Sequence, residues 1–298
     1  MFLRHSLTNV TLCDVSQIIP NPASRPIGVF DSGLGGLTVV RELAATMPGE
    51  DIVYLGDTAR VPYGSKSLET IRRFSLEDAS FLLRLTPKMV VVACNSASAA
   101  GIDALEAKCP VPVVDVIRPS AAAAVAATKG IIGVIGTAAT VASGAYSRAI
   151  AGIDPAREVL ARPCPLLVPI VEEGWPVDHA IVMCALSHYL HDLQRRRVGA
   201  LVLGCTHYPL LSVTIAKLMG PAVALISSGL AAAMDVQRRL VAANLANPNR
   251  QGGSLRCFTT DSAPLFATLG ERFSGRKIDS VECVGTEELE ASAVRENA

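Results

Sequence analysis

The sequence is short of charge and of aromatic side chains. Charged residues make up 18% of the 298-residue chain and aromatic residues 4%, and basic and acidic side chains are equal in number, 27 of each. Without a basic excess, the chain lacks the usual electrostatic mark of a nucleic-acid-binding protein, and it has no acidic tail. Half of its residues are hydrophobic, so we expect a large buried core and no nucleic-acid partner.

Signals for a membrane or for secretion are also missing. The Ala-rich stretch 119–146 is apolar, but Lys129 and several Gly and Thr residues interrupt it, so a membrane-spanning helix is not predicted. Residues 1–25 lack the continuous apolar core and the cleavage pattern of a secretory signal, and we expect a poorly ordered extension there. The eight cysteines include no Cys-x-x-Cys pair, which favours reduced thiols over a disulfide framework. These absences predict a cytoplasmic protein with no membrane partner.

No complete cofactor motif is present. Segment 31–36 is glycine-rich and follows a predicted strand, as in dinucleotide-binding proteins, but Thr38 occupies the position of the third glycine. Asp31 would in addition repel a pyrophosphate. A Walker A loop is absent, and Lys66 lacks the surroundings of a pyridoxal phosphate anchor. We therefore predict that the protein uses no cofactor.

One set of residues has the spacing of metal ligands. Cys184, His188 and His191 share one face of a helix predicted over about 177–196. A polar stripe on that helix is the preferred interpretation, so no metal site is predicted. Cys109, Cys164 and Cys184 are interpreted as thiols without a chemical role.

Short apolar runs alternate with helical patterns along the chain. This alternation predicts parallel sheets whose two faces are both covered by helices. The expected strands are at 27–30, 52–55, 90–92, 111–116, 130–137, 201–203, 222–226 and 257–260. The expected helices cover 37–47, 67–85, a segment that ends near 108, 177–196, 210–219 and a segment that ends near 243.

The second half of the chain repeats the plan of the first. Segment 130–137 echoes segment 27–32, and each half then reaches an apolar strand that ends on a cysteine, Cys94 or Cys205. The expected fold is α/β, with two similar doubly wound, mainly parallel-sheet domains related by pseudo-two-fold symmetry and the active site in the cleft between them. The predicted domains are residues 26–117 together with 228–298, and residues 118–227, after the extension 1–25.

Each of these two cysteines stands at the carboxyl end of a strand, where open α/β sheets bind their ligands. The pseudo-two-fold axis would bring Cys94 and Cys205 face to face. Two thiols that flank one carbon atom can remove a proton from one side and return it on the other, if one is a base while the other is an acid. Because both precede helices, backbone N–H groups and the helix dipole are expected to lower the thiol pKa and favour the thiolates.

Polar neighbours of the cysteines suit a substrate that carries a carboxylate. Asn95, Ser96 and Thr206 offer hydrogen-bond donors. Asp31 could exchange protons with a thiol or hold an ammonium group, and His207 could polarise the thiol of Cys205.

Five segments, in the correct order, resemble bacterial glutamate racemases of the aspartate/glutamate racemase family: residues 31–37, 57–67, 93–99, 135–140 and 204–209. The likeness extends over about residues 25–245. It implies a cofactor-independent interconversion of L- and D-glutamate that supplies D-glutamate for peptidoglycan. It also implies two similar α/β domains with the site between them, and a homodimer.

The resemblance assigns roles to individual residues. It implies that Cys94 is the base for the D-enantiomer and Cys205 the base for the L-enantiomer, with Asp31 and His207 as their helpers. Glu172 matches an acidic residue associated with the second thiol. The positions implied to bind the substrate are Asp31, Ser32, Pro62, Tyr63, Gly64, Asn95, Ser96, Thr137, Thr140, Thr206 and His207.

Three departures from the family pattern are present. Ser96 replaces a usual threonine and keeps the hydroxyl group, Arg118 replaces an acidic residue at the domain junction, and segment 227–229 replaces a motif that usually begins with aspartate. Three alternatives also stay open. They are a cysteine hydrolase with His207 as the base for Cys205, a racemase for aspartate or another acid, and a binding protein that uses the cleft without turnover.

Overall fold

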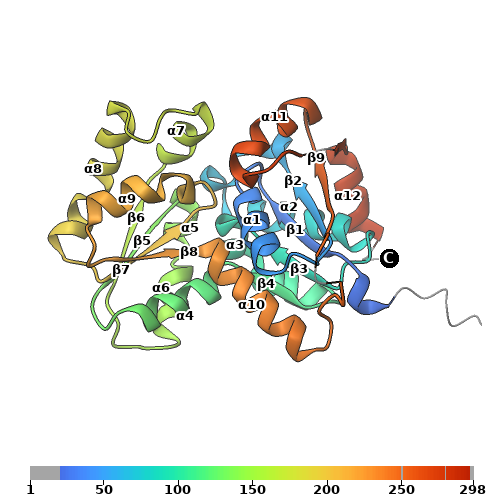
Figure 1. Cartoon of the computed structure of the whole chain (residues 1–298), viewed down its shortest axis with the longest axis horizontal. Helices are drawn as coiled ribbons and strands as arrows, with labels where there is room; N and C mark the ends of the chain where they lie inside the picture. Colours follow the sequence, from blue (N-terminus) through green and yellow to red (C-terminus); the bar gives the residue numbers. More distant parts are fainter. Residues whose placement is uncertain (1–20, 250, 279, 296–298) are drawn as a thin grey trace, which may run out of the picture.

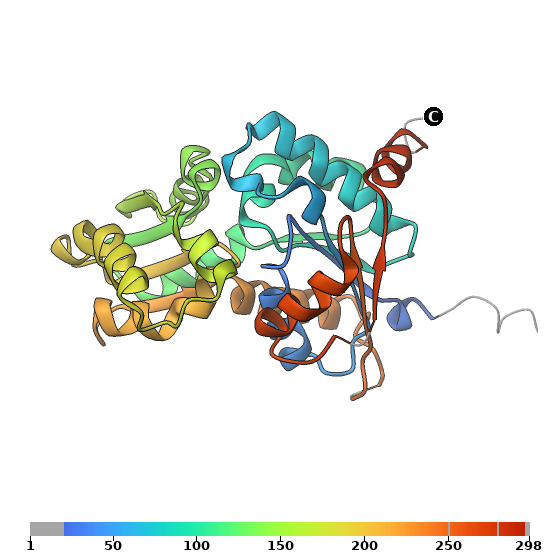
Figure 2. The ribbon, with the colours of Figure 1, turned by 90° about the horizontal axis from the view of Figure 1, so that it is seen from above.

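The computed structural model describes residues 21–249, 251–278 and 280–295. Most of the predicted extension, residues 1–20, lies outside the described residues. The described part begins with a short 3-10 helix, η2 (Pro22–Ser24). The rest forms two α/β domains, each built around its own parallel sheet, which lie side by side as two lobes (Figures 1 and 2).

The first domain is built around a six-stranded sheet in the order β10-β9-β2-β1-β3-β4. All its pairs are parallel. The strands are β1 (Ile27–Asp31), β2 (Ile52–Gly56), β3 (Met89–Val92), β4 (Val113–Asp115), β9 (Leu255–Thr259) and β10 (Val281–Cys283). The segment predicted at 111–116 is therefore β4, which lies at the edge of this sheet.

The second domain is built around a four-stranded parallel sheet in the order β6-β5-β7-β8. Its strands are β5 (Ile132–Gly136), β6 (Val159–Pro163), β7 (Ala200–Gly204) and β8 (Ala224–Ser227). Strand β6 has no counterpart among the sequence predictions, since its residues are only partly buried and carry a weak apolar signal.

Helices cover both faces of both sheets, as predicted (Figure 1). On the first sheet, one face carries α2 (Leu68–Leu83), α3 (Asn95–Lys108) and α12 (Thr286–Arg295), and the other carries α1 (Leu37–Thr46), α10 (Ser228–Ala242) and α11 (Ala263–Ser274). On the second sheet, one face carries α4 (Ile117–Ala127) and α6 (Ala145–Ala151), and the other carries α7 (Leu167–Glu173), α8 (Ala180–Arg195) and α9 (Ser212–Met219). The remaining elements are η3 (Thr58–Arg60), η4 (Tyr63–Ser65), α5 (Ala138–Ala142) and η5 (Tyr208–Leu211).

The central strands explain why the sequence shows continuous apolar runs instead of alternation. In β3, Met89 and Val91 pack into one core cluster, while Val90 and Val92 pack into the cluster on the opposite face. All four side chains are almost fully buried. A strand covered on both sides has no solvent face, so no polar residue is needed in it.

The two sheets repeat one topology. Within each, the strand that comes first in the chain pairs with the second and third, and the third pairs with the fourth. Phe30 pairs with Val92 in the first sheet, and Ile135 pairs with Leu203 in the second, and each of these partners precedes its cysteine by two residues. Cys94 and Cys205 are therefore equivalent positions, and the predicted duplication is confirmed. The same register makes Asp31 equivalent to Gly136.

The chain crosses between the domains twice. It leaves the first sheet where β4 leads into α4, and the side chain of Asp115 accepts the backbone N–H groups of Ile117 and Arg118 at this crossing, at 2.7 and 2.8 Å. It returns where β8 leads into α10, which packs against α1 and α4. These crossings support our proposal that the domain boundaries lie near residues 117 and 228.

Some helices and strands were not predicted from the sequence. Helices α4, α5, α6, α7, α11 and α12 and strand β10 were not predicted. Helices α5, α6 and α7 and strand β10 are short and α12 is polar, whereas α4 and α11 are neither. Arg118, one of the departures from the family pattern, pairs with Asp103, Glu106 and Asp115 at the surface, so an acidic neighbourhood surrounds it.

Across the described ranges, no helix is both long and apolar enough to cross a membrane.

Candidate active site

A cavity of about 150 Å3 lies at the carboxyl ends of strands from both sheets. Both cysteines line it, together with the polar side chains that follow the strands. Its lining consists of Ser32, Val61, Pro62, Tyr63, Gly64, Ser65, Cys94, Asn95, Ser96, Thr137, Ala138, Pro165, Val168, Pro169, Cys205, Thr206 and His207. Eleven of the predicted site residues are in this set, so the structure brings them together. The other three predicted residues contact lining residues: Asp31 contacts Thr206, Thr140 contacts Thr137, and Glu172 contacts His207.

Cys94 occupies the N-cap position of α3 and is 5% exposed. Its thiol donates to the hydroxyl oxygen of Ser32, with an Sγ–Oγ distance of 3.7 Å. Burial, followed by the negative charge of Asp31, raises the pKa of Cys94 to about 12, against the weaker effect of the Ala97 backbone N–H. The predicted lowering of this pKa is therefore wrong. The helix terminus is present, but its effect is smaller than the cost of burying a thiolate beside a carboxylate.

Cys205 has a different set of neighbours. Its Sγ lies 3.8 Å from Nδ1 of His207, and Nε2 of His207 lies 2.9 Å from Oε1 of Glu172. Burial acts to lower the pKa of His207, but the hydrogen bonds to Cys205 and Glu172 together raise it to about 10. At neutral pH the imidazole is therefore a cation, which can donate one N–H to Glu172 and the other to a Cys205 thiolate. Glu172 thus pairs with His207, whose other ring nitrogen lies beside the thiol.

Asp31 is completely buried below the cavity. Its carboxylate accepts the backbone N–H of Gly33 at 3.1 Å and the hydroxyl of Thr206 at 3.4 Å. Burial raises the pKa of Asp31, while the positive His207 opposes the rise. Asp31 therefore lies near both thiols: it accepts a hydrogen bond from Thr206, the neighbour of Cys205, and its charge acts on the thiol of Cys94.

Three hydroxyl groups form a cluster that crosses the domain boundary. Ser96 Oγ lies 2.9 Å from Thr137 Oγ1 and 3.4 Å from Thr140 Oγ1, and the two threonine hydroxyls are 2.9 Å apart. Thr137 also caps α5, because its Oγ1 accepts the N–H of Thr140 at 3.2 Å. The hydroxyls can rotate to donate to a ligand, which suits a carboxylate at this end of the cavity.

Asn95 lines the cavity, but much of its hydrogen-bonding capacity is used inside the protein. Its Oδ1 accepts the hydroxyl of Tyr146 at 2.7 Å, and its Nδ2 donates to Oγ of Ser228 at 3.5 Å. Ser228 in turn donates to the carbonyl oxygen of Leu203 in β7. Tyr146 and Ser228 were missed from the sequence. Ser228 belongs to segment 227–229, which the sequence marked as a departure without showing that it supports the site.

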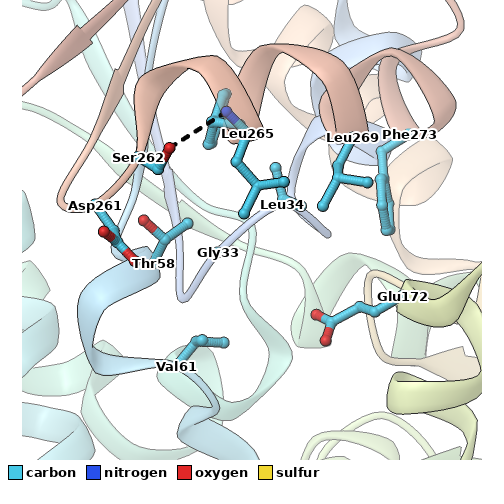
Figure 3. A pocket seen from close by; sticks show the side chains of 11 residues that line it. Gly33, Leu34, Thr58, Val61, Glu172, Asp261, Ser262, Leu265, Leu269 and Phe273 are labelled. Carbon is cyan, nitrogen blue, oxygen red and sulfur yellow. Dashed lines mark hydrogen bonds between the residues drawn. The ribbon is translucent and has the colours of Figure 1, made fainter.

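A second cavity, of about 230 Å3, adjoins the first (Figure 3). Glu172 projects toward it from the second domain, opposite the apolar residues Leu265, Leu269 and Phe273 of α11. Phe273 also packs edge-on against His207, with 5.2 Å between ring centroids. Helix α11 therefore lies against the His207–Glu172 pair, although nothing in its sequence connects it with the site.

The predicted helix with metal-like spacing is α8. Cys184, His188 and His191 are exposed along it. Within residues 21–249, 251–278 and 280–295, no group of three or more His, Cys, Asp or Glu side chains is placed to hold a metal ion.

Comparison with known proteins places the chain among racemases. The family model for Asp/Glu/hydantoin racemases matches residues 27–236. A glutamate racemase of Geobacter metallireducens is 46% identical over 264 residues, which are 88% of this chain and 97% of that protein. The crystal structure of a glutamate racemase isoform from Bacillus anthracis matches with a TM-score of 0.83 and 41% identity, over 87% of this chain and 97% of that one. The glutamate racemase of Francisella tularensis in complex with D-glutamate also matches with a TM-score of 0.83, at 38% identity, over 89% of this chain and 99% of that one.

Proposed function

The chain belongs to the Asp/Glu/hydantoin racemase family, and we propose that it interconverts L- and D-glutamate by moving the α-proton between Cys94 and Cys205. One observation carries this proposal: the two thiols occupy equivalent positions in two repeated domains and line the same small cavity. The glutamate racemases named above support glutamate as the substrate.

The two thiols have different charged neighbours, as a reaction with one acid and one base requires. Burial and Asp31 keep Cys94 as a neutral thiol, which is an acid, while the imidazolium of His207 can donate to a Cys205 thiolate, which is a base. With L-glutamate, Cys205 takes the α-proton and leaves the electron pair on the substrate. Cys94 then donates its proton to the opposite face of that carbon. The product is D-glutamate, and the enzyme ends with the proton on Cys205.

The donors around the cavity would stabilise the charge that develops on the substrate carboxylate. Ser32, Thr206 and the hydroxyl cluster of Ser96 and Thr137 line it from both domains. Preorganised donors in a water-excluded cavity contribute most to such a reaction because they need no rearrangement as charge moves. Asp31 is the proton partner on the Cys94 side in this scheme, and His207 with Glu172 serves the Cys205 side.

We further propose, from the same resemblance, that the protein acts in the cytoplasm as a homodimer and supplies D-glutamate for peptidoglycan. No cofactor enters the proposed steps, because the two thiols account for both proton transfers. Glutamate is the proposed small-molecule partner.

The test follows the circular dichroism of L-glutamate, and separately of D-glutamate, with the purified protein and no added cofactor. Wild type is compared with Cys94→Ser and Cys205→Ser, in H2O and in D2O. The proposal requires decay to zero from both enantiomers, deuterium at the α-carbon, and strong loss of activity in both variants. Decay with aspartate but not glutamate would move the substrate and keep the mechanism, whereas no change with any amino acid would favour a binding protein.

A further inference from the structure

Behind the cavity lies a buried group of charged side chains that the proposed reaction does not use. The Asp57 cluster, as we name it, surrounds the hydroxyl group of Tyr63, whose residue lines the cavity. The side chains of Asp57 and Asp78 are 0% exposed, that of Arg60 is 10% exposed, and that of Glu77 is 8% exposed. The cluster consists of Asp57, Arg60, Tyr63, Glu77 and Asp78.

Three acidic side chains share one buried cation, Arg60, and the exposed Arg73 pairs with Glu77, with 4.0 Å between Nε and Oε1. Arg60 donates Nε to Asp57 at 2.7 Å and Nη2 to Asp78 at 3.1 Å, and its Nη1 donates to Glu77. If all three carboxyl groups were ionised, Arg60 and Arg73 would compensate two of the negative charges, and one would remain uncompensated with almost no contact with water. A buried charge without a partner is so costly that a proton is normally bound instead.

The hydroxyl of Tyr63 shows where that proton is needed. It contacts Oδ2 of Asp57 and lies 2.9 Å from Oδ2 of Asp78. A tyrosine hydroxyl has one hydrogen, so it can donate to only one of two carboxylates, and a second close carboxylate oxygen would be repelled. Both contacts become favourable when one carboxyl group is protonated and donates to the tyrosine oxygen.

The remaining hydrogen bonds distinguish the two acids. Asp57 accepts Nε of Arg60 at its Oδ2 and the hydroxyl of Thr260, 3.0 Å away, at its Oδ1, so both oxygens of its carboxylate receive donors. Asp78 accepts Nη2 of Arg60 at Oδ1, which leaves its Oδ2 to face the tyrosine hydroxyl. Burial, and next the charge of Asp57, raise the pKa of Asp78 well above its usual value, in agreement with a proton on Asp78.

We propose that Asp78 stays protonated and donates to Tyr63, while the ionised Asp57 accepts from Tyr63, so that the Asp57 cluster positions the cavity wall formed by Pro62, Tyr63 and Gly64. Asp57, Arg60 and Asp78 are thus positioning residues that act through Tyr63. The effect on substrate rests on the proposed racemase function, whereas the location of the proton does not.

The wall that this cluster holds reaches the other domain. Gly64 follows Tyr63, and a Cβ atom built on it would lie 2.7 Å from the side chain of Thr137. Thr137 belongs to the hydroxyl cluster with Ser96. A shift of the Tyr63 hydroxyl would therefore displace Gly64 against Thr137 and disturb the donors at the carboxylate end of the cavity.

The first experiment compares Asp57→Asn, Asp78→Asn and Tyr63→Phe in glutamate racemisation, with Glu69→Gln as a control for an exposed acid on the same helix α2. The amide introduced by Asp78→Asn is neutral like the protonated acid and can donate through Nδ2, so this variant should keep KM within about twofold of wild type. Asp57→Asn and Tyr63→Phe should raise KM about tenfold or more with a smaller effect on kcat, since small displacements at a binding site are costly.

The second experiment measures the melting temperatures of wild type and Asp78→Asn between pH 4 and pH 8, and needs no activity. Above its ordinary pKa of about 4, an aspartate in the unfolded chain releases its proton, whereas the native Asp78 keeps it. The wild type should therefore lose stability relative to Asp78→Asn as the pH rises. The groups that face residue 78 are the same in wild type and variant: Asp57, Arg60, Tyr63 and Glu77. Their own effects on the melting temperature therefore cancel to first order in this comparison.

Each outcome decides the proposal. Equal KM increases in Asp57→Asn and Asp78→Asn, or a melting difference that does not grow with pH, would show that Asp78 is ionised and overturn it. If Asp57→Asn does not fold, Tyr63→Phe provides the KM measurement, and an unchanged KM there would show that the cluster only stabilises the fold. If the wild type does not racemise glutamate, the proposed function fails, and the melting series still locates the proton.

Discussion

Arg272 donates its Nη2 to the carbonyl oxygen of Val171, 2.9 Å away, and so joins helix α11 of the first domain to helix α7 of the second. Its Nη1 also lies 3.4 Å from the carbonyl oxygen of Glu172. Helix α7 ends at Gly174, where a Cβ atom would lie 2.7 Å from the Arg272 guanidinium. The arginine therefore fixes the end of the helix that presents Glu172 to His207.

We expect Arg272→Ala to lower kcat about tenfold, because α7 would lose its link and Glu172 would hold His207 less firmly; tenfold corresponds to about 1.4 kcal/mol. Steady-state kinetics with glutamate measure the effect. Arg238→Ala, which removes another exposed arginine that pairs on the surface of α10, is the control and should leave kcat unchanged. Equal kinetics for the two variants would rule out a role for Arg272 at the site.

Glu172→Gln should shift the alkaline limb of the pH–activity profile to lower pH. Among the groups that raise the His207 pKa to about 10 against burial, Cys205 comes first and Glu172 second, so loss of the carboxylate should lower this pKa. Glu173→Gln changes the adjacent, exposed residue and should leave the profile unchanged. An unshifted profile in Glu172→Gln would mean that the ion pair does not set the protonation of His207.

The same histidine should make stability depend on pH. Its native pKa lies above the unfolded value of about 6.5, so its contribution is present below pH 6.5 and is lost as the pH rises through about 10. Urea unfolding between pH 6 and pH 10 should show this loss in wild type and a smaller loss in His207→Gln. A loss of equal size in both proteins would assign it to other groups.

Gly35→Ala should reduce kcat/KM about a hundredfold, on the scale expected for misplaced catalytic groups. A Cβ atom at this position would overlap Oγ1 of Thr206 and lie 2.5 Å from Nδ1 of His207. The control is Gly152→Ala, whose Cβ would have no neighbour nearer than 3.5 Å. Normal activity of Gly35→Ala would show that the loop moves aside without disturbing the site.

Lys88→Ala should lower the free energy of unfolding by about 3 kcal/mol or more, because it leaves a buried carboxylate without its partner. Lys88 Nζ pairs with Glu50 and donates to the carbonyl oxygens of Ala23 at 2.6 Å and Leu245 at 2.9 Å. Urea denaturation measures the change, with the exposed Lys129→Ala as the control. Equal stability of the two variants would show that the buried pair contributes nothing net.

The sequence was a good guide to the sheets and to the lining of the cavity, for a physical reason. Buried parallel strands must be apolar throughout, and the residues after them must be polar to meet a ligand, so Val90–Ser96 and Leu201–His207 both carry a clear pattern. The echo between segments 27–32 and 130–137 was also sufficient to predict the repeated topology, which the strand orders confirm.

The sequence could not provide the effects that depend on distant residues. The rise in the Cys94 pKa comes from burial and from Asp31, which local helix-terminus reasoning does not weigh. Tyr146 reaches Asn95 from 51 residues away, and Arg272 contacts α7 from 101 residues away. No periodicity or motif in one segment reports such partners, because the tertiary fold alone brings them together.

The duplicated scaffold is symmetric, but its side chains are not: the first repeat has Asp31 where the second has Gly136, and His207 stands where the first has Ser96. Mirror-image amino acids have equal free energies, so their equilibrium constant is one. Thermodynamics then requires equal kcat/KM in the two directions for wild type and for every variant. The asymmetry of the two thiols can therefore appear only as a difference in kcat that an equal difference in KM matches. A mutation on one side must slow both directions equally at low substrate concentration. The rates of the two directions can differ only near saturation.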